Sequence, residues 1–133
     1  MVSFLTLFEK ALEARKLAYA PYSEFKVGAA ILTSKGNVYL GANVENVSYP
    51  CGTCAEAGAI AAMVCGGEYQ ISDIVVVANG KNLITPCGAC LQRIFEFSNK
   101  ETKIHLADLE GIKKTYRIDE LLPISFYQED LKK

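Results

Sequence analysis

The chain has 133 residues, half of them hydrophobic, and a formal net charge of −1. This length predicts a single domain, residues 1–133, with a sizeable core, and the near-neutral charge gives no reason to expect a nucleic-acid partner. No stretch is apolar and long enough to span a membrane, and five cysteines without a secretory signal predict a reducing, cytoplasmic location.

Helical and strand patterns alternate along the chain. Ser3 is suited to cap a first helix, which Ala20-Pro21 ends because the residue before a proline avoids the helical region. Residues 71–78 include an apolar run without alternation, which is typical of a central strand covered on both faces. Helices are predicted over residues 4–17, 54–64 and 86–97, and strands over residues 25–33, 38–46, 71–78, 103–107 and 113–118.

The second predicted strand carries a polar pair, Asn43 and Glu45, close to its end. Because these residues are two apart, both side chains are expected on the same face of the strand. Such a pair is often merely solvated. Here the chain leads directly to Cys54, so a ligand-binding role is the stronger interpretation.

Two cysteine clusters open two of the predicted helices. Cys54 precedes Glu56 by two residues, and Cys87 and Cys90 form a Cys-x-x-Cys pair behind Pro86. This spacing lets one turn present two thiolates to one zinc ion, and a helix N-terminus lowers the pKa of a thiol. Glu56 lies about 200° around a helix from Cys54, so its carboxylate is expected beside a metal rather than on it, where it could move protons.

A closed structural zinc site is the competing interpretation. Cys51 and Cys54 form a second Cys-x-x-Cys pair, so Cys51, Cys54, Cys87 and Cys90 could hold a zinc ion with no open position. The protein would then be a non-enzymatic, zinc-stabilised binding module. Glu56 favours catalysis, because a structural module leaves that carboxylate without a role.

Motifs along nearly the whole chain resemble the small, homotetrameric cytidine deaminases. The matching residues are Ala20-Pro21-Tyr22-Ser23, Phe25, Val27-Gly28-Ala29-Ala30, Gly41, Asn43-Val44-Glu45-Asn46, Tyr49, Cys54-Ala55-Glu56, Pro86-Cys87-Gly88-Ala89-Cys90, Gln92, Glu120-Leu121-Leu122-Pro123 and Phe126. The resemblance implies an α/β fold, a three-layer α/β/α sandwich with a mixed five-stranded sheet. It also implies zinc-dependent hydrolysis of cytidine and 2′-deoxycytidine to the uridine nucleosides and ammonia, in pyrimidine salvage.

The resemblance also assigns roles to individual residues. One zinc ion per chain would be held by Cys54, Cys87 and Cys90, with Glu56 as the proton shuttle. The nucleoside would contact Asn43 and Glu45 through its sugar hydroxyls. Further substrate contacts would come from Phe25 and Ala55 and, across the subunit boundaries of a homotetramer, from Tyr49 and Phe126.

The chain departs from these deaminases in the charges around the metal. Three thiolates and one Zn²⁺ ion sum to −1, and relatives with three cysteines commonly carry an arginine directly after the glutamate and another directly after the last cysteine. Here those positions are Ala57 and Leu91. Arg93 lies three residues after Cys90, on the same helix face, so we expect it to offset the thiolate charge together with helix N–H groups.

The remaining positions are given structural roles, and two other deaminase activities are disfavoured. His105 is expected to be structural and Cys65 to be a buried, inert thiol, whereas residues 121–127 are too aromatic for a solvated tail. A deaminase of an aminonucleoside antibiotic such as blasticidin S is disfavoured, because that group differs at the segment around Asn43 and Glu45. A nucleic-acid editor is disfavoured by the charge and the compact size.

Overall fold

The computed structural model of the protein describes residues 2–131 and is built on one five-stranded sheet, in the order β2-β1-β3-β4-β5. Strands β3 and β4 run parallel, and the other neighbouring pairs are antiparallel. The mixed sheet implied by the sequence is therefore confirmed. The strands are β1 (Val27–Thr33), β2 (Val38–Ala42), β3 (Ile71–Ala78), β4 (Lys103–Ala107) and β5 (Ile112–Arg117).

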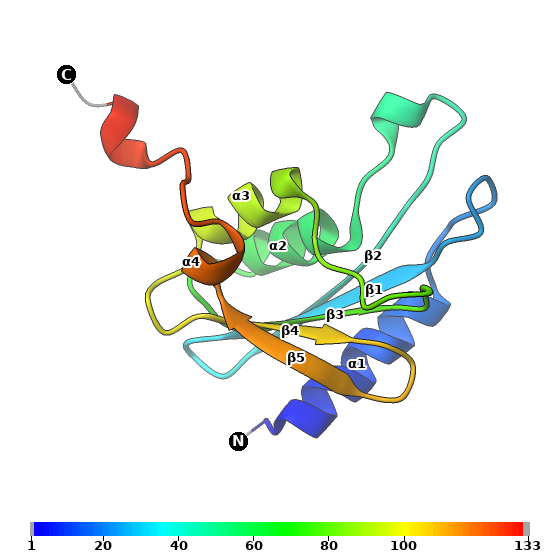
Figure 1. Ribbon diagram of the computed structural model, residues 1–133, viewed down its shortest axis with the longest axis horizontal. Helices are drawn as coiled ribbons and strands as arrows, with labels where there is room; N and C mark the ends of the chain where they lie inside the picture. Colours follow the sequence, from blue (N-terminus) through cyan, green and yellow to red (C-terminus); the bar gives the residue numbers. More distant parts are fainter. Residues whose placement is uncertain (1, 132–133) are drawn as a thin grey trace.

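Helices cover both faces of this sheet and complete the three layers (Figure 1). Helix α1 packs on one face, and α2 and α3 lie together on the other. None of the helices within residues 2–131 is long and apolar enough to cross a membrane. The helices are α1 (Phe4–Lys16), α2 (Ala55–Cys65), α3 (Gly88–Glu96) and the short α4 (Ile118–Leu121), with 3-10 turns at η1 (Tyr49–Cys51) and η2 (Gln128–Leu131).

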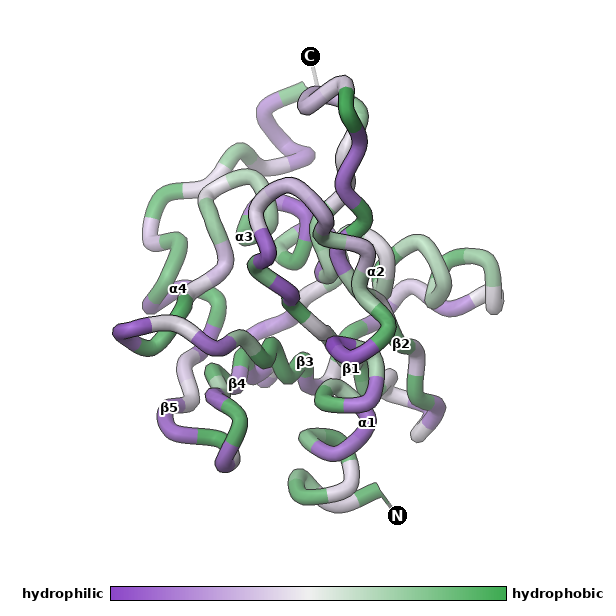
Figure 2. The backbone as a smooth tube through the Cα atoms, turned by 90° about the vertical axis from the view of Figure 1, so that its right-hand side faces the viewer, coloured by the Kyte–Doolittle hydropathy of each residue, from purple (hydrophilic) through white to green (hydrophobic). Residues whose placement is uncertain are grey.

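The central strand β3 supplies apolar side chains to both layers. Ile74 and Val76 belong to the core beneath α2 and α3, and Val75 and Val77 belong to the core beneath α1. All four are at most 1% exposed. The hydrophobic colour of β3 in Figure 2 follows from this burial on both faces, as the unalternating sequence of the strand predicts.

Both strands of the first hairpin are shorter than predicted, because side chains replace the ladder at their ends. The N–H of Phe25 donates to Ser23 Oγ (3.0 Å), and its carbonyl accepts from Asn43 Nδ2 (2.8 Å). Strand β1 therefore begins at Val27. Beyond β2 the backbone pairs elsewhere, since Val44 and Thr53 exchange two hydrogen bonds of 2.9 Å.

Two expectations outside the site have different outcomes. The prediction of a buried Cys65 is wrong: the residue is exposed, because it closes α2 at a surface turn where Val64 and Gly66 are exposed as well. His105 is buried, and its ring nitrogens lie 2.8 Å from Asp73 Oδ1 and 2.8 Å from Thr115 Oγ1. Its predicted structural role fits these contacts, which occupy both nitrogens.

A close approach between β2 and α2 positions the helix that follows Cys54. A Cβ atom added to Gly41 would lie 2.2 Å from the Ala55 carbonyl oxygen and 2.3 Å from the Ala59 nitrogen. Both of these are backbone atoms of α2, which cannot move aside as a side chain can. The absence of a side chain at Gly41 therefore sets how closely the first turn of α2 approaches the sheet.

We expect Gly41→Ala to lower the free energy of unfolding by about 2 kcal/mol or more, because the added methyl group overpacks a backbone contact. Urea denaturation followed by circular dichroism measures this change. Gly58→Ala is the matched control from the helix side of the same contact, where an added Cβ meets its neighbours at 3.6 Å or more. Because alanine favours a helix, this control should be neutral or stabilising by up to about 1 kcal/mol. Equal stability of Gly41→Ala and the wild type would contradict the packing argument.

Candidate active site

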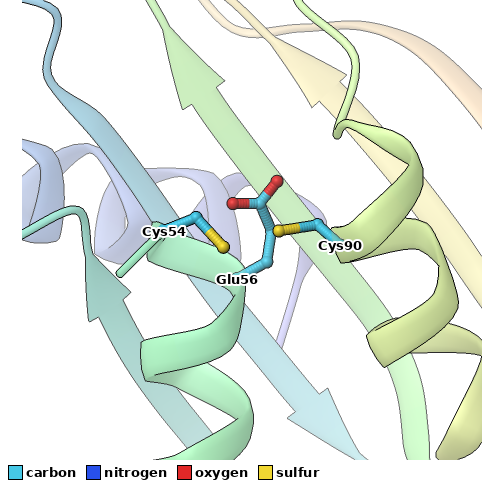
Figure 3. A group of neighbouring side chains, drawn as sticks. All are labelled: Cys54, Glu56 and Cys90. Atoms are coloured by element: carbon cyan, nitrogen blue, oxygen red, sulfur yellow. The ribbon is translucent and has the colours of Figure 1, made fainter. Parts of the chain in front are cut away.

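The N-termini of α2 and α3 meet over the sheet and bring the cysteine clusters together (Figure 3). Cys54 is the N-cap residue of α2 and Cys87 is the N-cap residue of α3. Cys90 lies in the first turn of α3 and is 1% exposed. Because the N-terminal ends of helix dipoles carry partial positive charge, this arrangement favours thiolates at both helix starts.

Three of the predicted site residues form a compact group. Cys54 Sγ, Cys90 Sγ and a carboxylate oxygen of Glu56 all lie within 4.8 Å of one another. The expectation that Glu56 points away from Cys54 is therefore wrong. Cys54 has an extended backbone (φ −85°, ψ 160°), so it stands outside the helix and the angular spacing of a helix does not apply to the pair.

The two thiol groups influence each other's ionisation. Cys90 donates a hydrogen bond to the sulfur of Cys54, which lowers the pKa of Cys54 to about 6 despite its partial burial. The same hydrogen bond, together with burial and the neighbouring Glu56, Cys54 and Cys87 charges, raises the pKa of Cys90. The pair is thus poised with one thiolate, a ligand atom that zinc favours.

Glu56 is a buried carboxyl group. It is 5% exposed, and burial is the main cause that raises its pKa above the ordinary value for glutamate. The negative charge of Cys54 raises it further, and the positive charge of Arg93 opposes the shift. A raised pKa brings a carboxyl group closer to the range in which it can both accept and release a proton near neutral pH.

Arg93 supplies positive charge to the two sulfurs. Its guanidinium Nη1 lies 3.7 Å from Cys90 Sγ and 4.0 Å from Cys54 Sγ. The contact expected from the spacing of Arg93 and Cys90 is therefore present, and it extends to the second sulfur. The arginine extends from the second turn of α3 to the sulfurs. A cation is therefore present beside them although positions 57 and 91 carry alanine and leucine instead of arginine.

A pocket of about 570 Å³ opens beside this group. Its lining includes Cys54, Ala55, Glu56, Cys87 and Cys90. The predicted substrate residues Asn43, Glu45 and Tyr49 also line it, together with residues to which no contact with the substrate was assigned from the sequence: Tyr22, Ser23, Val27, Val44, Asn46, Gly52, Thr53, Val76, Ile84, Thr85 and Pro86.

Two of the predicted substrate residues lie outside this lining. The backbone of Phe25 is hydrogen-bonded to the side chains of Ser23 and Asn43, which do line the pocket. Phe126 is 60% exposed on the C-terminal segment that projects from the body of the molecule (Figure 1). Its backbone N–H and carbonyl are bonded to the side-chain amide of Gln92 on α3 (3.2 and 2.8 Å).

Asn43 and Glu45 are already engaged by the chain itself. Asn43 Oδ1 accepts from the Val27 N–H (2.8 Å), and Asn43 Nδ2 donates to the Phe25 carbonyl. Glu45 Oε1 accepts from the backbone N–H groups of Tyr22 (2.9 Å) and Ser23 (3.0 Å). These bonds lower the pKa of Glu45, with the Ser23 side chain as the largest cause. The pair therefore forms a fixed wall of the pocket instead of a solvated strand end.

The comparisons with known proteins agree with this geometry. The family model of the cytidine and deoxycytidylate deaminase zinc-binding region matches residues 2–106. The chain belongs to this deaminase family. The cytidine deaminase of Halalkalibacterium halodurans is 42% identical over 125 residues, which cover 94% of this chain and 95% of that protein.

Solved structures lead to the same family. The crystal structure of cytidine deaminase from Burkholderia pseudomallei matches with a TM-score of 0.89 at 38% identity, covering 94% of this chain and all of that one. The cytidine deaminase of Mycobacterium tuberculosis matches with a TM-score of 0.81 at 35% identity, covering 96% and 99% of the two chains. These likenesses extend to the sheet and to the helices that carry the cysteines.

The residues of this deaminase site fit zinc. Cys54 and Cys90 offer soft sulfur ligands beside an N-terminal helix dipole, and Cys87 lines the same pocket. Cys51 differs from these cysteines because it does not line the pocket, and its Sγ lies 3.5 Å from the Ser48 hydroxyl. The arrangement therefore favours a site with an open position over a closed four-cysteine site.

Removing Arg93 should weaken zinc binding, because the two sulfurs lose a nearby cation. We expect Arg93→Ala to reduce zinc affinity about tenfold or more, as substitutions around metal ligands typically do. Competition with a chromogenic chelator measures the affinity without relying on turnover. Lys10→Ala, on the exposed surface of α1, removes the same charge far from the site and serves as the control. Unchanged zinc affinity in Arg93→Ala would show that the arginine does not offset the negative charge of the sulfurs.

Proposed function

We propose that the protein deaminates cytidine and 2′-deoxycytidine hydrolytically, with one zinc ion per chain. The observation that carries this proposal is the buried carboxyl group of Glu56, which lies within 4.8 Å of the sulfurs of Cys54 and Cys90 and lines the same pocket. Membership of the cytidine and deoxycytidylate deaminases supports the same reaction. Water replaces the 4-amino group of the pyrimidine, so the products are the corresponding uracil nucleoside and ammonia.

Cys54, Cys87 and Cys90 would hold the metal, which in this chemistry supplies a Lewis acid and lowers the pKa of a water. Glu56 takes a proton from the attacking water and delivers it to N3 of the pyrimidine. The same carboxyl group then helps to protonate the departing amine, so that the C4–N bond breaks as ammonia leaves. Burial suits Glu56 for this double role. The raised pKa makes the carboxylate a stronger base for the first transfer, and a pKa closer to neutrality lets the same group both take up and release a proton.

The remaining walls of the pocket suit the sugar of a nucleoside. Glu45 is a hydrogen-bond acceptor, and Asn43 lies beside it on the same segment. We assign the 3′-hydroxyl group to Glu45, with Asn43 in support. The backbone at Ala55, in the first turn of α2, is assigned to the edge of the base.

The charges of the lining favour a nucleoside over a nucleotide. Among the described residues that line the pocket, none is a lysine, arginine or histidine, whereas Glu45 and Glu56 are carboxylates. A phosphate group would enter this pocket without a cationic partner and against like charge. Of the two substrate classes in the description of the family, the neutral nucleoside is therefore proposed.

Assembly into a homotetramer with shared sites is part of the proposal. The C-terminal segment exposes Ile124 (89%), Phe126 (60%) and Leu131 (73%), an unusual amount of apolar surface for a projecting tail. A neighbouring subunit that covers this segment would bring Phe126 to its own base-binding pocket. Tyr49, which is 78% exposed at the rim, is suited to contacts across the same boundary.

The proposal also covers cellular context. Three thiols must stay reduced to bind zinc, which suits the cytoplasm. Recovery of uridine from cytidine is a step of pyrimidine salvage. The whole chain is proposed to act as one deaminase domain.

Replacement of Glu56 tests the reaction directly. We expect wild-type protein to bind one zinc per chain and to reduce the ultraviolet absorbance of cytidine as uridine forms. Glu56→Gln should keep zinc but lose at least about 100-fold in kcat, because general acid–base catalysis is removed. Elemental analysis and the absorbance assay, on the same samples, separate metal binding from turnover.

Cys51→Ser is the matched control for this experiment. It should keep both zinc and activity, because Cys51 lies outside the pocket. Loss of zinc from Cys51→Ser would instead support a structural four-cysteine site. Wild-type protein that holds zinc but leaves cytidine unchanged would refute the proposed reaction.

The absence of a cationic lining gives a second test. We expect kcat/KM for 2′-deoxycytidine to exceed that for its 5′-monophosphate by on the order of 100-fold, through unfavourable charge interactions. Added salt should reduce this difference in kcat/KM, because salt screens the repulsion between the phosphate group and the carboxylates of the open pocket. Equal efficiency on the two compounds would mean that a cation outside the pocket lining receives the phosphate.

A further inference from the structure

The Glu45 carboxylate is held by two consecutive residues of a distant loop. Oε1 accepts from the N–H groups of Tyr22 and Ser23, and Oε2 accepts from the Ser23 hydroxyl. Tyr22, Ser23 and Glu45 all line the pocket. The group that is assigned to the sugar thus depends on Ser23 for two of its three hydrogen bonds.

Ser23 is also the centre of a tight turn. Its Oγ accepts from the N–H of Phe25 (3.0 Å), across Glu24. Glu24 has a φ of +57°, a left-handed conformation that is unfavourable for a residue with a side chain. The turn therefore holds an unfavourable backbone conformation in place next to the pocket.

These two contacts fix the direction of the Ser23 hydroxyl. A hydroxyl group has one proton to donate. Because the N–H of Phe25 occupies the acceptor side of Oγ, the proton is directed to Glu45 Oε2. The carboxylate is thereby kept ionised and oriented, and its remaining lone pairs can accept from a ligand hydroxyl.

We propose that Ser23 is a positioning residue that determines how strongly the enzyme recognises the 3′-hydroxyl group of its nucleoside. This inference rests on the proposed function, in which Glu45 accepts from that hydroxyl. Ser23 acts through Glu45. Without its hydroxyl, the carboxylate keeps its two backbone N–H donors on Oε1 but loses the bond that orients Oε2.

A purely structural role in the turn would have a different consequence. If Ser23 only supports the left-handed backbone at Glu24, its loss would disturb the pocket for every substrate alike. Glycine at position 24 would then repair the damage, because glycine adopts a positive φ without strain. The positioning role is specific to ligands that carry a 3′-hydroxyl, and glycine at position 24 cannot restore the missing donor.

The experiment compares cytidine with 3′-deoxycytidine on zinc-loaded wild type, Ser23→Ala, Ser23→Thr and the double variant Ser23→Ala/Glu24→Gly. We expect Ser23→Ala to raise KM for cytidine about tenfold, the effect of losing one charge-assisted hydrogen bond. The KM for 3′-deoxycytidine should change less than about threefold, so that the preference of the enzyme for cytidine falls. Ser23→Thr, which keeps the hydroxyl, should retain the preference, and the double variant should not regain it.

The outcomes separate this inference from the proposed function. Wild-type protein without activity on cytidine overturns the proposed function, and the inference with it, before any variant is compared. If wild type is active and prefers cytidine, an equal loss on both substrates in Ser23→Ala overturns the inference alone. Recovery of the preference in the double variant overturns it as well. Thermal melting of each variant identifies any that is unfolded. If Ser23→Ala does not fold, the double variant carries the test, because it also lacks the hydroxyl while its glycine relieves the backbone strain at position 24.

Discussion

Concentrated negative charge at the meeting point of two helices is the constraint on which this structure depends. Cys54, Cys90 and Glu56 bring two sulfurs and a carboxyl group within 4.8 Å of one another, with Cys87 lining the same pocket. Such a group would repel itself in a plain apolar core. The helix N-termini, the hydrogen bond between the Cys54 and Cys90 thiols and the guanidinium of Arg93 each reduce that repulsion.

One hydrogen-bonded segment joins the pocket wall formed by Asn43 and Glu45 to the cysteine group. The segment that carries Asn43 and Glu45 is bonded on one side to residues 19–27 and on the other to Thr53, which directly precedes Cys54. Asn43 and Glu45 at one end and Cys54 at the other thus belong to one hydrogen-bonded unit. A ligand that contacts both ends therefore meets a preorganised surface, which reduces the ordering cost of binding.

Much of the fold was predictable from local patterns, because β3 and the capped helices have strong signals of their own. The runs at residues 71–78 and 103–107 were placed as they are observed, and the cysteine spacing correctly indicated two helix starts. The contact of Arg93 with the sulfurs followed from its position on the same helix face as Cys90.

What the sequence could not provide depends on long-range contacts. Glu56 faces Cys54 because the cap residue leaves the helical conformation, which periodicity does not record. The ends of the first hairpin depend on side chains of Ser23 and Asn43 that replace backbone partners. Ser23 itself had a signal in the motif that precedes Phe25, but its role needs the carboxylate of a residue 22 positions away.

Helix α3, which carries Cys90, is also the crossover between β3 and β4, the parallel pair in the described part of the sheet. Parallel strands pair only through such a connection, and non-local pairing is slow to form. During synthesis Cys54 therefore emerges well before its partner thiols can be positioned, and the exposed Cys51 emerges with it. The nascent chain passes through a period in which its thiols are open to oxidation or to the wrong metal. This period ends when the sheet closes and α3 packs on it, because Cys90 is then buried beside Cys54 and Glu56.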